Sequence, residues 1–459
     1  MHSKLMARLA ALSMVTAAVS TLAPGCSSDS NADGGPDASG LVGDALPDAP
    51  PNWTTAPNRE VRNLHMTWQR DSATTVTFQW ATTDTDLSAY VPKVWAVPTS
   101  LTEGSGDAVV MPWDESYVHT GAGLIYREAL LGIETGTEDF VVWTVEATGL
   151  QPDTEYTFRV GTWEGFDPQT GVFTSPDLSA PSTVRTGLPK GERKPFSMVM
   201  AGDSRGGTDE IRANVDRLAE IDARLWFFNG DMTNGGAQVE WDDWQDAMAP
   251  VLRSRVLMPV QGNHEIFADI YYAQYALPQE QTLPEDLLEH AWSLDFGNVH
   301  FVGLDSNTEE TVAAQVDWLD ADLAAARQDP GIDWIFVMMH HGVYSASNHG
   351  STPRLQEYWV PVFEKYDVDL VFCGHDHDYE RTFPLRADQV VEPDEGIVYV
   401  VAGGFYSPAY SNGTAWWTAT SAHGDLRNYV EVGVDGGTVN VTAWSGDGTE
   451  VLDQFTLTR

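Results

Sequence analysis

The stretch DLVFCGHDHDYER, residues 369–381, places an apolar run directly before a cluster of histidine and carboxylate side chains. Residues 369–373 are typical of a short buried strand, and a helix predicted over 353–366 leads into it. Strands that alternate with helices in this way indicate an α/β fold. Because the carboxyl ends of strands in an open α/β sheet meet at one crevice, the motif GHDH at 374–377 predicts a functional site.

Four apolar runs upstream end in the same manner. The strands that we predict there cover residues 196–201, 224–229, 256–261 and 334–339. Apolar residues at helical spacing lie among them, at 211–221 and 312–323. The polar side chains that follow the five strands are, in chain order, Asp203, Asp231, Asn263, His340, His375 and His377. Two Asp, one Asn and at least three His are therefore expected around one crevice.

These side chains have the chemistry of a metal centre. Carboxylate and amide oxygens together with imidazole nitrogens suit zinc, manganese or iron ions. A carboxylate shared by two ions holds them roughly 3.5–4 Å apart, and such a pair activates a water as hydroxide for in-line attack on a phosphoryl group. Glycine beside the ligands lets the backbone come close to the ions. A lone Gly-Asp pair is usually a turn, so the prediction rests on the ordered set of five segments.

An all-β domain is predicted over residues 58–187, in front of the α/β domain at 195–459. Residues 74–80 alternate polar and apolar side chains, as a half-buried strand does. The run LQPDTEYTFRV at 150–160 resembles fibronectin type III domains, with Tyr156 where those sandwiches place their tyrosine corner. We expect this module to support or orient the α/β domain without chemistry of its own.

The first 26 residues resemble a secretory signal of the bacterial lipoprotein type. Basic residues precede an alanine-rich apolar stretch, and Cys26 follows it as the residue that would be lipidated. The alternative is a plain cleaved signal with an unmodified Cys26. Residues 27–57 are rich in Ser, Asp, Gly and Pro, which predicts a disordered acidic linker. We expect an exported protein of the cell envelope or a secreted one, with a lipid anchor at Cys26 as its membrane contact.

The formal net charge of −42 limits the partners of this chain. Such a field repels nucleic acid and anionic membrane surfaces, so neither is an expected partner. It equally repels phosphate esters, so a site for them needs a local positive centre, which metal ions supply. The two cysteines, Cys26 and Cys373, stand in unlike contexts. A disulfide framework is therefore not expected, and Cys373 is predicted to pack in the core.

Together these motifs resemble the calcineurin-like metallophosphoesterases and, within them, the purple acid phosphatases. The sharpest match is residues 363–381, down to the Tyr-Glu-Arg tail, and residues 315–319 and 343–350 resemble two further family segments. The resemblance covers about residues 60–459. It implies a two-sheet sandwich flanked by helices in four layers, with a C-terminal hairpin near 430–457. It also implies hydrolysis of small-molecule phosphate esters.

The resemblance implies a role for each site residue. The cofactors would be two divalent or trivalent ions of Fe, Zn or Mn. The implied ligands are Asp203 and His377 for the first ion, Asp231 as the bridge, and Asn263, His340 and His375 for the second ion. His264 and His349 would be the catalytic histidines, which contact the substrate phosphate and aid protonation of the leaving group.

Two positions depart from the family pattern. Purple enzymes place a tyrosine three residues after the bridging Asp, and its charge transfer to iron gives the colour. Here Asn234 stands at that position, which predicts a colourless protein and a weaker first site. Other branches place a histidine where this chain has Arg205. Both residues are candidates for weak metal or substrate contact, and the alternative for Arg205 is a structural role.

Three functions fit these residues. The first is an acid phosphatase-like phosphomonoesterase, the second is a phosphodiesterase or nucleotidase with the same site, and the third is a cell-surface binding protein with a degenerate phosphatase site. The remaining histidines of note, His290, His300 and His341, are expected to be structural. Glu265 is expected to orient His264.

Overall fold

The computed structural model describes residues 59–459, apart from 88–89, 128, 131–132, 135–138, 164, 168–171, 175–176, 268, 281 and 423–426. The predicted signal at 1–26 and the predicted linker at 27–57 lie outside the described residues. Residues Arg59–Arg459 form one compact unit. Among its described helices, none has both the length and the apolar character that crossing a bilayer requires.

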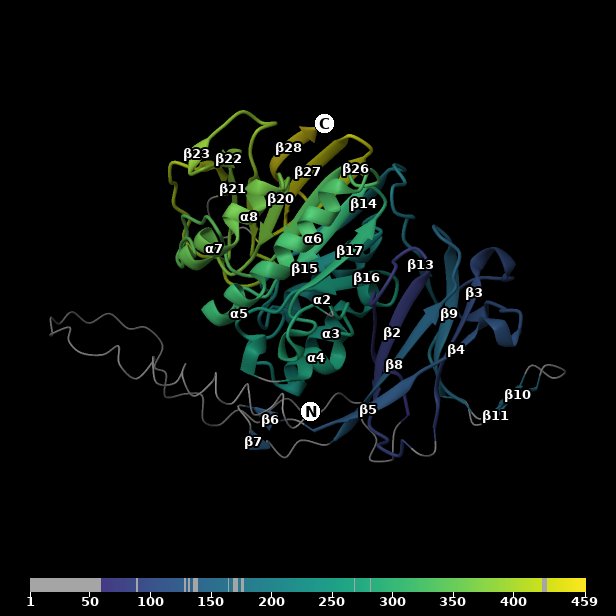
Figure 1. Ribbon diagram of the computed structural model, residues 1–459. Helices are drawn as coiled ribbons and strands as arrows, with labels where there is room; N and C mark the ends of the chain where they lie inside the picture. Colours follow the sequence, from purple (N-terminus) through teal and green to yellow (C-terminus); the bar gives the residue numbers. More distant parts are fainter. Residues whose placement is uncertain are drawn as a thin grey trace. The chain divides into compact units, whose positions relative to one another are not determined.

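Two antiparallel sheets build the N-terminal domain (Figure 1). The first has the order β1-β2-β8-β5, with strands at Arg62–Thr67, Thr75–Thr82, Phe140–Thr148 and Ala122–Tyr126. The second has the order β12-β9-β3-β4, with β13 also on β9, and its strands are Asp177–Leu178, Glu155–Thr162, Pro92–Pro98, Val118–Thr120 and Ser182–Arg185. Alternate side chains of both sheets meet in one core, where the rings of Phe78 and Phe158 lie 4.7 Å apart. The all-β prediction is confirmed.

The tyrosine-corner contact is present in this domain. Tyr156 is buried, and its hydroxyl accepts a 2.8 Å hydrogen bond from the backbone N–H of Gln151. A tyrosine that bonds to the backbone a few residues upstream is typical of immunoglobulin-like sandwiches. The fibronectin type III resemblance itself stays a prediction.

The α/β domain contains a six-stranded sheet of mixed direction. Its order is β16-β15-β14-β26-β27-β28, with strands at Val256–Pro259, Leu225–Phe228, Phe196–Ala201, Asn428–Asp435, Thr438–Ser445 and Val451–Thr458. The first three strands are parallel and the last three form an antiparallel meander. The predicted C-terminal hairpin is therefore part of this sheet.

A seven-stranded sheet forms the second half of the α/β domain. Its order is β17-β18-β19-β20-β24-β21-β25, with strands at Trp292–Phe296, Val299–Gly303, Trp334–Met338, Leu370–Cys373, Val398–Ala402, Tyr379–Thr382 and Thr418–Ser421. The central strands β18, β19, β20 and β24 are parallel. β19 and β20 are buried along their whole length and are continuous apolar runs, as their sequences indicated.

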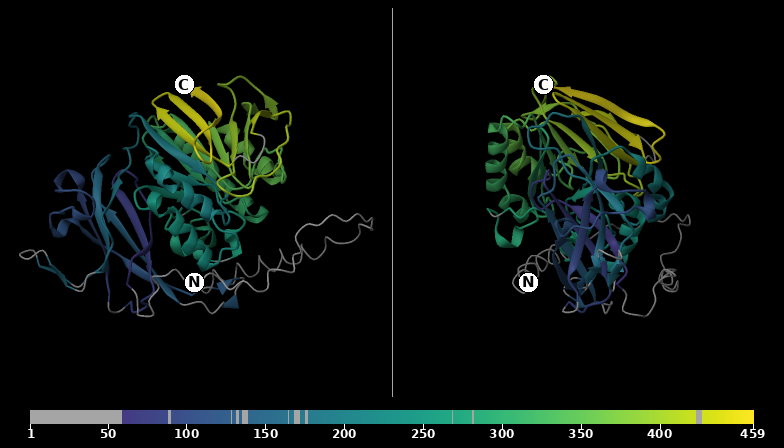
Figure 2. Two further views of the ribbon diagram at one scale, coloured as in Figure 1. Left: turned by 180° about the vertical axis from the view of Figure 1, so that it is seen from behind. Right: turned by 90° about the vertical axis from the view of Figure 1, so that its right-hand side faces the viewer.

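The two sheets pack against each other, and helices cover their outer faces (Figures 1 and 2). Phe336 and Phe372 share a core with the six-stranded sheet, whereas their neighbours Val337 and Val371 share a core with helices on the other side. The helices that bury side chains in these two cores are α2 Thr208–Glu220, α3 Gln238–Leu252 and α4 Ile270–Gln274 in the first, and α5 Glu309–Ala314, α6 Val316–Gln328, α7 Pro353–Tyr358 and α8 Val360–Lys365 in the second. The four-layer fold is confirmed.

The single helix predicted over 353–366 is two helices, and that prediction is corrected. α7 ends at Tyr358 and α8 begins at Val360, with Trp359 between them. Pro361 has no N–H to donate and crowds the backbone before it, so one continuous helix is disfavoured there. The break turns the buried Trp359 indole toward the Val312 carbonyl, to which it donates a 3.1 Å hydrogen bond.

Candidate metal centre

The predicted ligands lie in the loops that follow five parallel strands. These strands are β14, β15 and β16 of one sheet and β19 and β20 of the other. Three of the ligands have left-handed backbone, with φ of 63° at Asp203, 56° at Asp231 and 71° at His375. Such φ values are uncommon for residues other than glycine, and they concentrate at functional sites. Both sheets therefore hold strained ligand loops at the ends of their strands.

Glycines let these loops come together. A Cβ atom at Gly374 would lie 2.3 Å from Asp203 Oδ2, and one at Gly262 would lie 2.2 Å from Asp231 Oδ1. Contacts this short do not occur between a methyl group and an oxygen, so a side chain at either position displaces a carboxylate. Glycine at these two positions therefore lets the backbone come close to the ligand carboxylates, and its predicted closeness to the ions stays a prediction.

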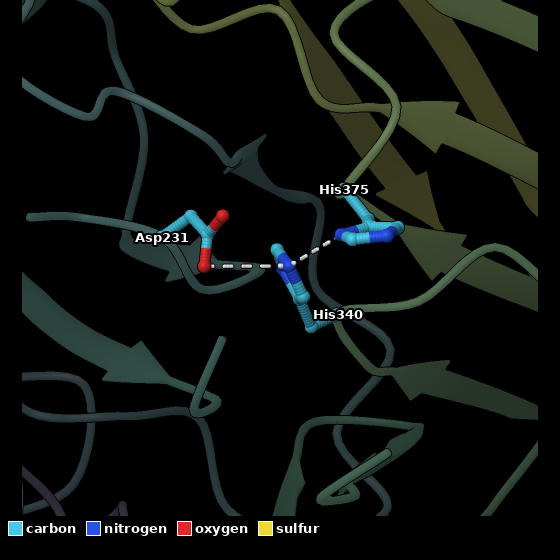
Figure 3. Close-up of side chains that lie close together, drawn as sticks. All are labelled: Asp231, His340 and His375. Carbon is cyan, nitrogen blue, oxygen red and sulfur yellow. Dashed lines mark hydrogen bonds and ion pairs between the residues drawn. The ribbon is translucent and has the colours of Figure 1, made fainter. Parts of the chain in front are cut away.

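Four side chains, Asp231, Asn263, His340 and His375, converge on one point, and we call them the tight half-site. His340 Nε2 lies 2.9 Å from Asn263 Oδ1, 3.1 Å from His375 Nδ1 and 3.4 Å from Asp231 Oδ1. Figure 3 shows the Asp231 carboxylate and the His375 ring approaching the same nitrogen of His340. Ligands about 2.0–2.2 Å from a tetrahedral ion are separated by roughly 3.3 Å, so these spacings fit one ion.

The protonation of the tight half-site also suits a metal. Burial lowers the pKa of His340 and of His375, which keeps both rings neutral. His340 Nδ1 donates a 2.7 Å hydrogen bond to the Asn229 carbonyl, so its Nε2 presents a lone pair to the Asn263 carbonyl oxygen. Two lone pairs that face each other repel, and a cation between them turns this repulsion into attraction. The predicted second-ion residues thus fit an ion.

A second group, Asp203, Arg205 and His377, lies beside the first, and we call it the arginine half-site. Asp203 is fully buried, its Oδ2 accepts a 2.8 Å hydrogen bond from the backbone N–H of His375, and its Oδ1 has no hydrogen-bond partner. His377 Nε2 lies 3.6 Å from that Oδ1. Burial and the neighbouring Asp231 raise the pKa of Asp203, and burial lowers the pKa of His377 to about 4. This half-site needs positive charge.

Arg205 brings a positive charge into this half-site. Its Nη2 donates to His377 Nε2 at 2.7 Å, its Nη1 donates to His264 Nε2 at 2.6 Å, and its Nε lies 3.7 Å from Asp231 Oδ2. Each ring nitrogen that Arg205 contacts carries a lone pair, because a guanidinium only donates. Arg205 therefore lies inside the site and contacts His264 and His377; whether it binds substrate phosphate or has a structural role stays a prediction.

Family models match both domains of the chain. Residues 61–177 match the purple acid phosphatase N-terminal domain, and residues 197–379 match the calcineurin-like phosphoesterase domain. The second match spans all the residues of the two half-sites. The chain is a purple acid phosphatase-like member of the calcineurin-like phosphoesterases. It is therefore a hydrolytic phosphoesterase, of a family that uses a dinuclear metal site and whose fold suits small phosphate esters.

The similarity of the phosphoesterase to other proteins extends beyond the motifs. An uncharacterized protein of Mycobacterium tuberculosis is 28% identical over 394 residues, which cover 75% of this chain and 69% of the relative. Purple acid phosphatase 21 of Arabidopsis thaliana is 27% identical over 55% of this chain and 56% of its own length. The solved purple acid phosphatase PPD1 from yellow lupin (Lupinus luteus) seeds has a TM-score of 0.71 at 17% identity, over 87% of this chain and 75% of that one. The chain thus spans just over half of the Arabidopsis relative.

The two catalytic candidates flank the half-sites of the phosphoesterase. His264 Nε2 lies 3.8 Å from Asp231 Oδ2, and its Nδ1 donates to the backbone carbonyl of Asn234. His349 is exposed, and the centroid of its ring lies 4.1 Å from that of His375. Asn234 is also exposed and meets His264 through its backbone oxygen. Its role as a weak ligand stays a prediction.

Glu265 contacts a different group from the one predicted. It is buried, and its carboxylate accepts hydrogen bonds from the backbone N–H groups of Asp231 at 2.8 Å, Gly262 at 2.9 Å and Thr233 at 3.1 Å. It therefore fixes the loop that carries Asp231, whereas Asn234 and Arg205 orient His264. Burial and Asp231 raise the pKa of Glu265 to about 8.

Tyr410 is a site residue that the sequence did not reveal. Its ring stacks on that of His377 with centroids 4.0 Å apart, and its hydroxyl accepts a 3.0 Å hydrogen bond from Arg205. It lies in the loop between β24 and β25, where no motif marks it.

The three histidines that were predicted to be structural form hydrogen bonds with residues outside the two half-sites. His341 Nδ1 bonds to Ser306, His290 to Asp305, and His300 to two carboxylates. Cys373 is buried in the helix-side core, as predicted, and burial raises the pKa of its thiol to about 12.

Proposed function

We propose that the chain hydrolyses phosphate monoesters with a metal ion held in the tight half-site. The observation that carries this proposal is the meeting of Asp231, Asn263 and His375 around His340 Nε2, within 2.9 to 3.4 Å. An ion held there would lower the pKa of water to yield hydroxide near neutral pH and would polarise a phosphoryl oxygen. That the relatives of this chain include proteins named purple acid phosphatases supports a monoester as the substrate.

A monoester dianion is best neutralised by two positive centres. Besides the ion of the tight half-site, the resemblance implies the first ion at Asp203 and His377, which would make the site dinuclear. Arg205 lies in that same half-site and carries a permanent charge. We therefore place the phosphate between the tight half-site and a positive centre in the arginine half-site.

The proton for the leaving group has one best donor. His264 accepts at Nε2 from Arg205 and donates at Nδ1 to a backbone carbonyl, so both of its nitrogens are occupied. His349 is exposed, and its backbone N–H donates a 2.8 Å hydrogen bond to buried Asp376, which fixes its loop. We propose His349 as the general acid, a role typically worth ~10²–10⁴-fold in rate.

The test is a panel of phosphate monoesters and diesters, assayed after reconstitution with zinc, manganese or iron. We expect faster turnover of monoesters and loss of turnover in Asp231→Ala. Faster turnover of diesters would replace the monoester proposal with a phosphodiesterase. Fewer than one ion per chain, together with no turnover, would favour the degenerate site.

We also propose that the protein is exported and anchored through Cys26, on the signal-like sequence at 1–26. Radiolabelled palmitate fed to a bacterial host should label the wild type and not Cys26→Ser. Equal labelling of the two, or retention of both in the cytoplasm, would remove this proposal.

A further inference from the structure

We propose that Arg205 takes the place of the first metal ion, so that the enzyme binds one ion and completes its site with a guanidinium. This inference rests on the proposed function, because it names the second positive centre of that site. It departs from the dinuclear arrangement implied by the family resemblance. The argument comes from the contacts of Arg205 and from the residues that surround it.

The guanidinium contacts two of the three residues that would hold the first ion. Nη2 lies 2.7 Å from His377 Nε2, and Nε lies 3.7 Å from Asp231 Oδ2. The lone pair of His377 is aimed at Arg205, because the other ring nitrogen donates a 2.8 Å hydrogen bond to the Pro408 carbonyl. The orbital that would bind an ion is therefore already used by a cation of the chain itself.

Arg205 is held firmly in this position. Its Nη1 donates to His264 at 2.6 Å and its Nη2 donates to the Tyr410 hydroxyl at 3.0 Å. Tyr410 is in turn fixed on His377, by ring stacking at 4.0 Å and by a 2.9 Å hydrogen bond from its backbone N–H to the His377 carbonyl. Only 19% of the Arg205 side chain is exposed, and both of its Nη atoms have hydrogen-bond partners, so it is not a loose surface residue.

The loop that would complete the first ion's ligands points elsewhere. Asn234 occupies the tyrosine position of the purple enzymes, is exposed, and turns its backbone carbonyl toward His264. The first ion would then have only Asp203, His377 and the shared Asp231 as ligands, whereas the tight half-site offers four residues to its ion. A guanidinium has a fixed charge and a planar fork of donors that matches phosphoryl oxygens, so it can serve as the second positive centre.

Metal content measures the proposal directly. Purified protein is loaded with excess Mn²⁺, freed of unbound metal, and analysed for ions per chain by mass spectrometry. We expect one ion in the wild type and one in Asp203→Asn. Arg205→His, which exchanges the guanidinium for a ligand nitrogen, should hold two. Arg212→His on the exposed face of α2 is the matched control and should hold one.

Electron paramagnetic resonance gives a second readout that needs no turnover. The wild type should show the hyperfine pattern of an isolated Mn²⁺ ion, whereas Arg205→His should show the broadened signal of a coupled pair. Arg205→Lys retains the positive charge and should keep one ion. One ion bound in this variant shows that a change at position 205 does not by itself unfold the tight half-site.

Two ions in the wild type, falling to one in Asp203→Asn, would overturn the inference. One ion in Arg205→His would also overturn it, because the guanidinium would not be what excludes the second ion. Neither result touches the proposed function, which depends on loss of hydrolysis in Asp231→Ala. Conversely, a wild type with one ion and no hydrolysis of any phosphate ester would remove the function and leave the metal count standing.

Discussion

Each half-site contains a histidine whose Nδ1 is held by a backbone carbonyl, but the Nε2 of the two rings meets different partners. His340 and His377 each donate Nδ1 to a backbone carbonyl, of Asn229 and Pro408, and so present a lone pair at Nε2. In the tight half-site that lone pair meets an oxygen and a nitrogen that cannot all pair without a cation. In the arginine half-site it accepts from Arg205. Both residues are histidines, so the residue type does not decide whether the ring can bind a metal. The group that faces Nε2 decides it.

The largest expected effect comes from His340→Ala. Removing the residue around which the tight half-site converges should abolish metal binding and lower kcat/KM by at least about 1,000-fold, since an ion stabilises the transition state by several kcal/mol. Steady-state kinetics and metal content measure both effects.

The adjacent His341 is the matched control for this prediction. It bonds to Ser306, so His341→Ala should retain the ion and lose about 10–100-fold in activity. An equal loss of metal in the two variants would contradict the assignment of His340 as a ligand.

Gly374 lies where the two half-sites meet, and Gly374→Ala should have the next largest effect. Its Cβ would lie 2.3 Å from Asp203 Oδ2, so the Asp203 and His375 loops must separate. A misplacement of about 1 Å costs on the order of 100-fold in rate, and we expect at least that in kcat/KM.

Gly433→Ala in β26 is the control for crowding, because its Cβ would meet its nearest neighbour at 4.0 Å. Its activity should match the wild type. Full activity in Gly374→Ala would show that the loops have more room than the structure gives them.

His377→Ala separates the two half-sites most sharply. If Arg205 is the second positive centre, removing its partner should leave one ion bound and lower kcat/KM by about 10–100-fold, through misplacement of the guanidinium. Metal analysis alongside kinetics distinguishes this result from loss of a ligand. A fall in bound metal would place an ion, and not Arg205, beside His377.

The smallest effect on activity is expected far from both half-sites, at His300. Burial by itself lowers the pKa of His300, but Asp322 at 2.9 Å and Asp295 at 2.7 Å outweigh burial and raise it to about 9. Because the folded pKa exceeds the unfolded value of about 6.5, the stabilisation is complete below pH 6.5 and is lost as pH rises through 9.

The comparison of His300→Gln with wild type tests this sign. In urea titrations at pH 6, the free energy of unfolding of the variant should be lower than that of the wild type by on the order of 2–3 kcal/mol. The difference should shrink toward pH 10. Metal content and kcat at neutral pH should match wild type. A difference that grows with pH would contradict the charged state of His300.

Much of the site was predictable because its signals are local. An apolar run followed by glycine and a ligand marks a buried strand and the turn after it, and the strand predicted at 196–201 is observed with those bounds. The other predicted strands extend one or two residues beyond the observed ones, at one end or at both. Backbone pairing stops short of the turns at both ends of a strand, and hydropathy does not register that change.

Local pattern did not predict how the helices break. The apolar spacing through 312–323 continues across Gln315, where α5 ends and α6 begins. The Gln315 side chain is buried. Its amide donates a 2.8 Å hydrogen bond to the Asp305 carbonyl and accepts a 3.1 Å hydrogen bond from the Asp305 N–H. A contact between two segments, and not the propensity of either, sets that break.

By itself, the sequence determined the α/β class and the order along the chain of the strands and candidate ligands, because strand period and glycine spacing are written into short segments. The assignment of four of these ligands to one ion came from the family resemblance. Only the tertiary structure decided that Arg205 lies against His377 and that Tyr410 holds both. Those contacts join residues 172 and 205 positions apart. Their geometry follows from how two sheets pack, which no single segment encodes.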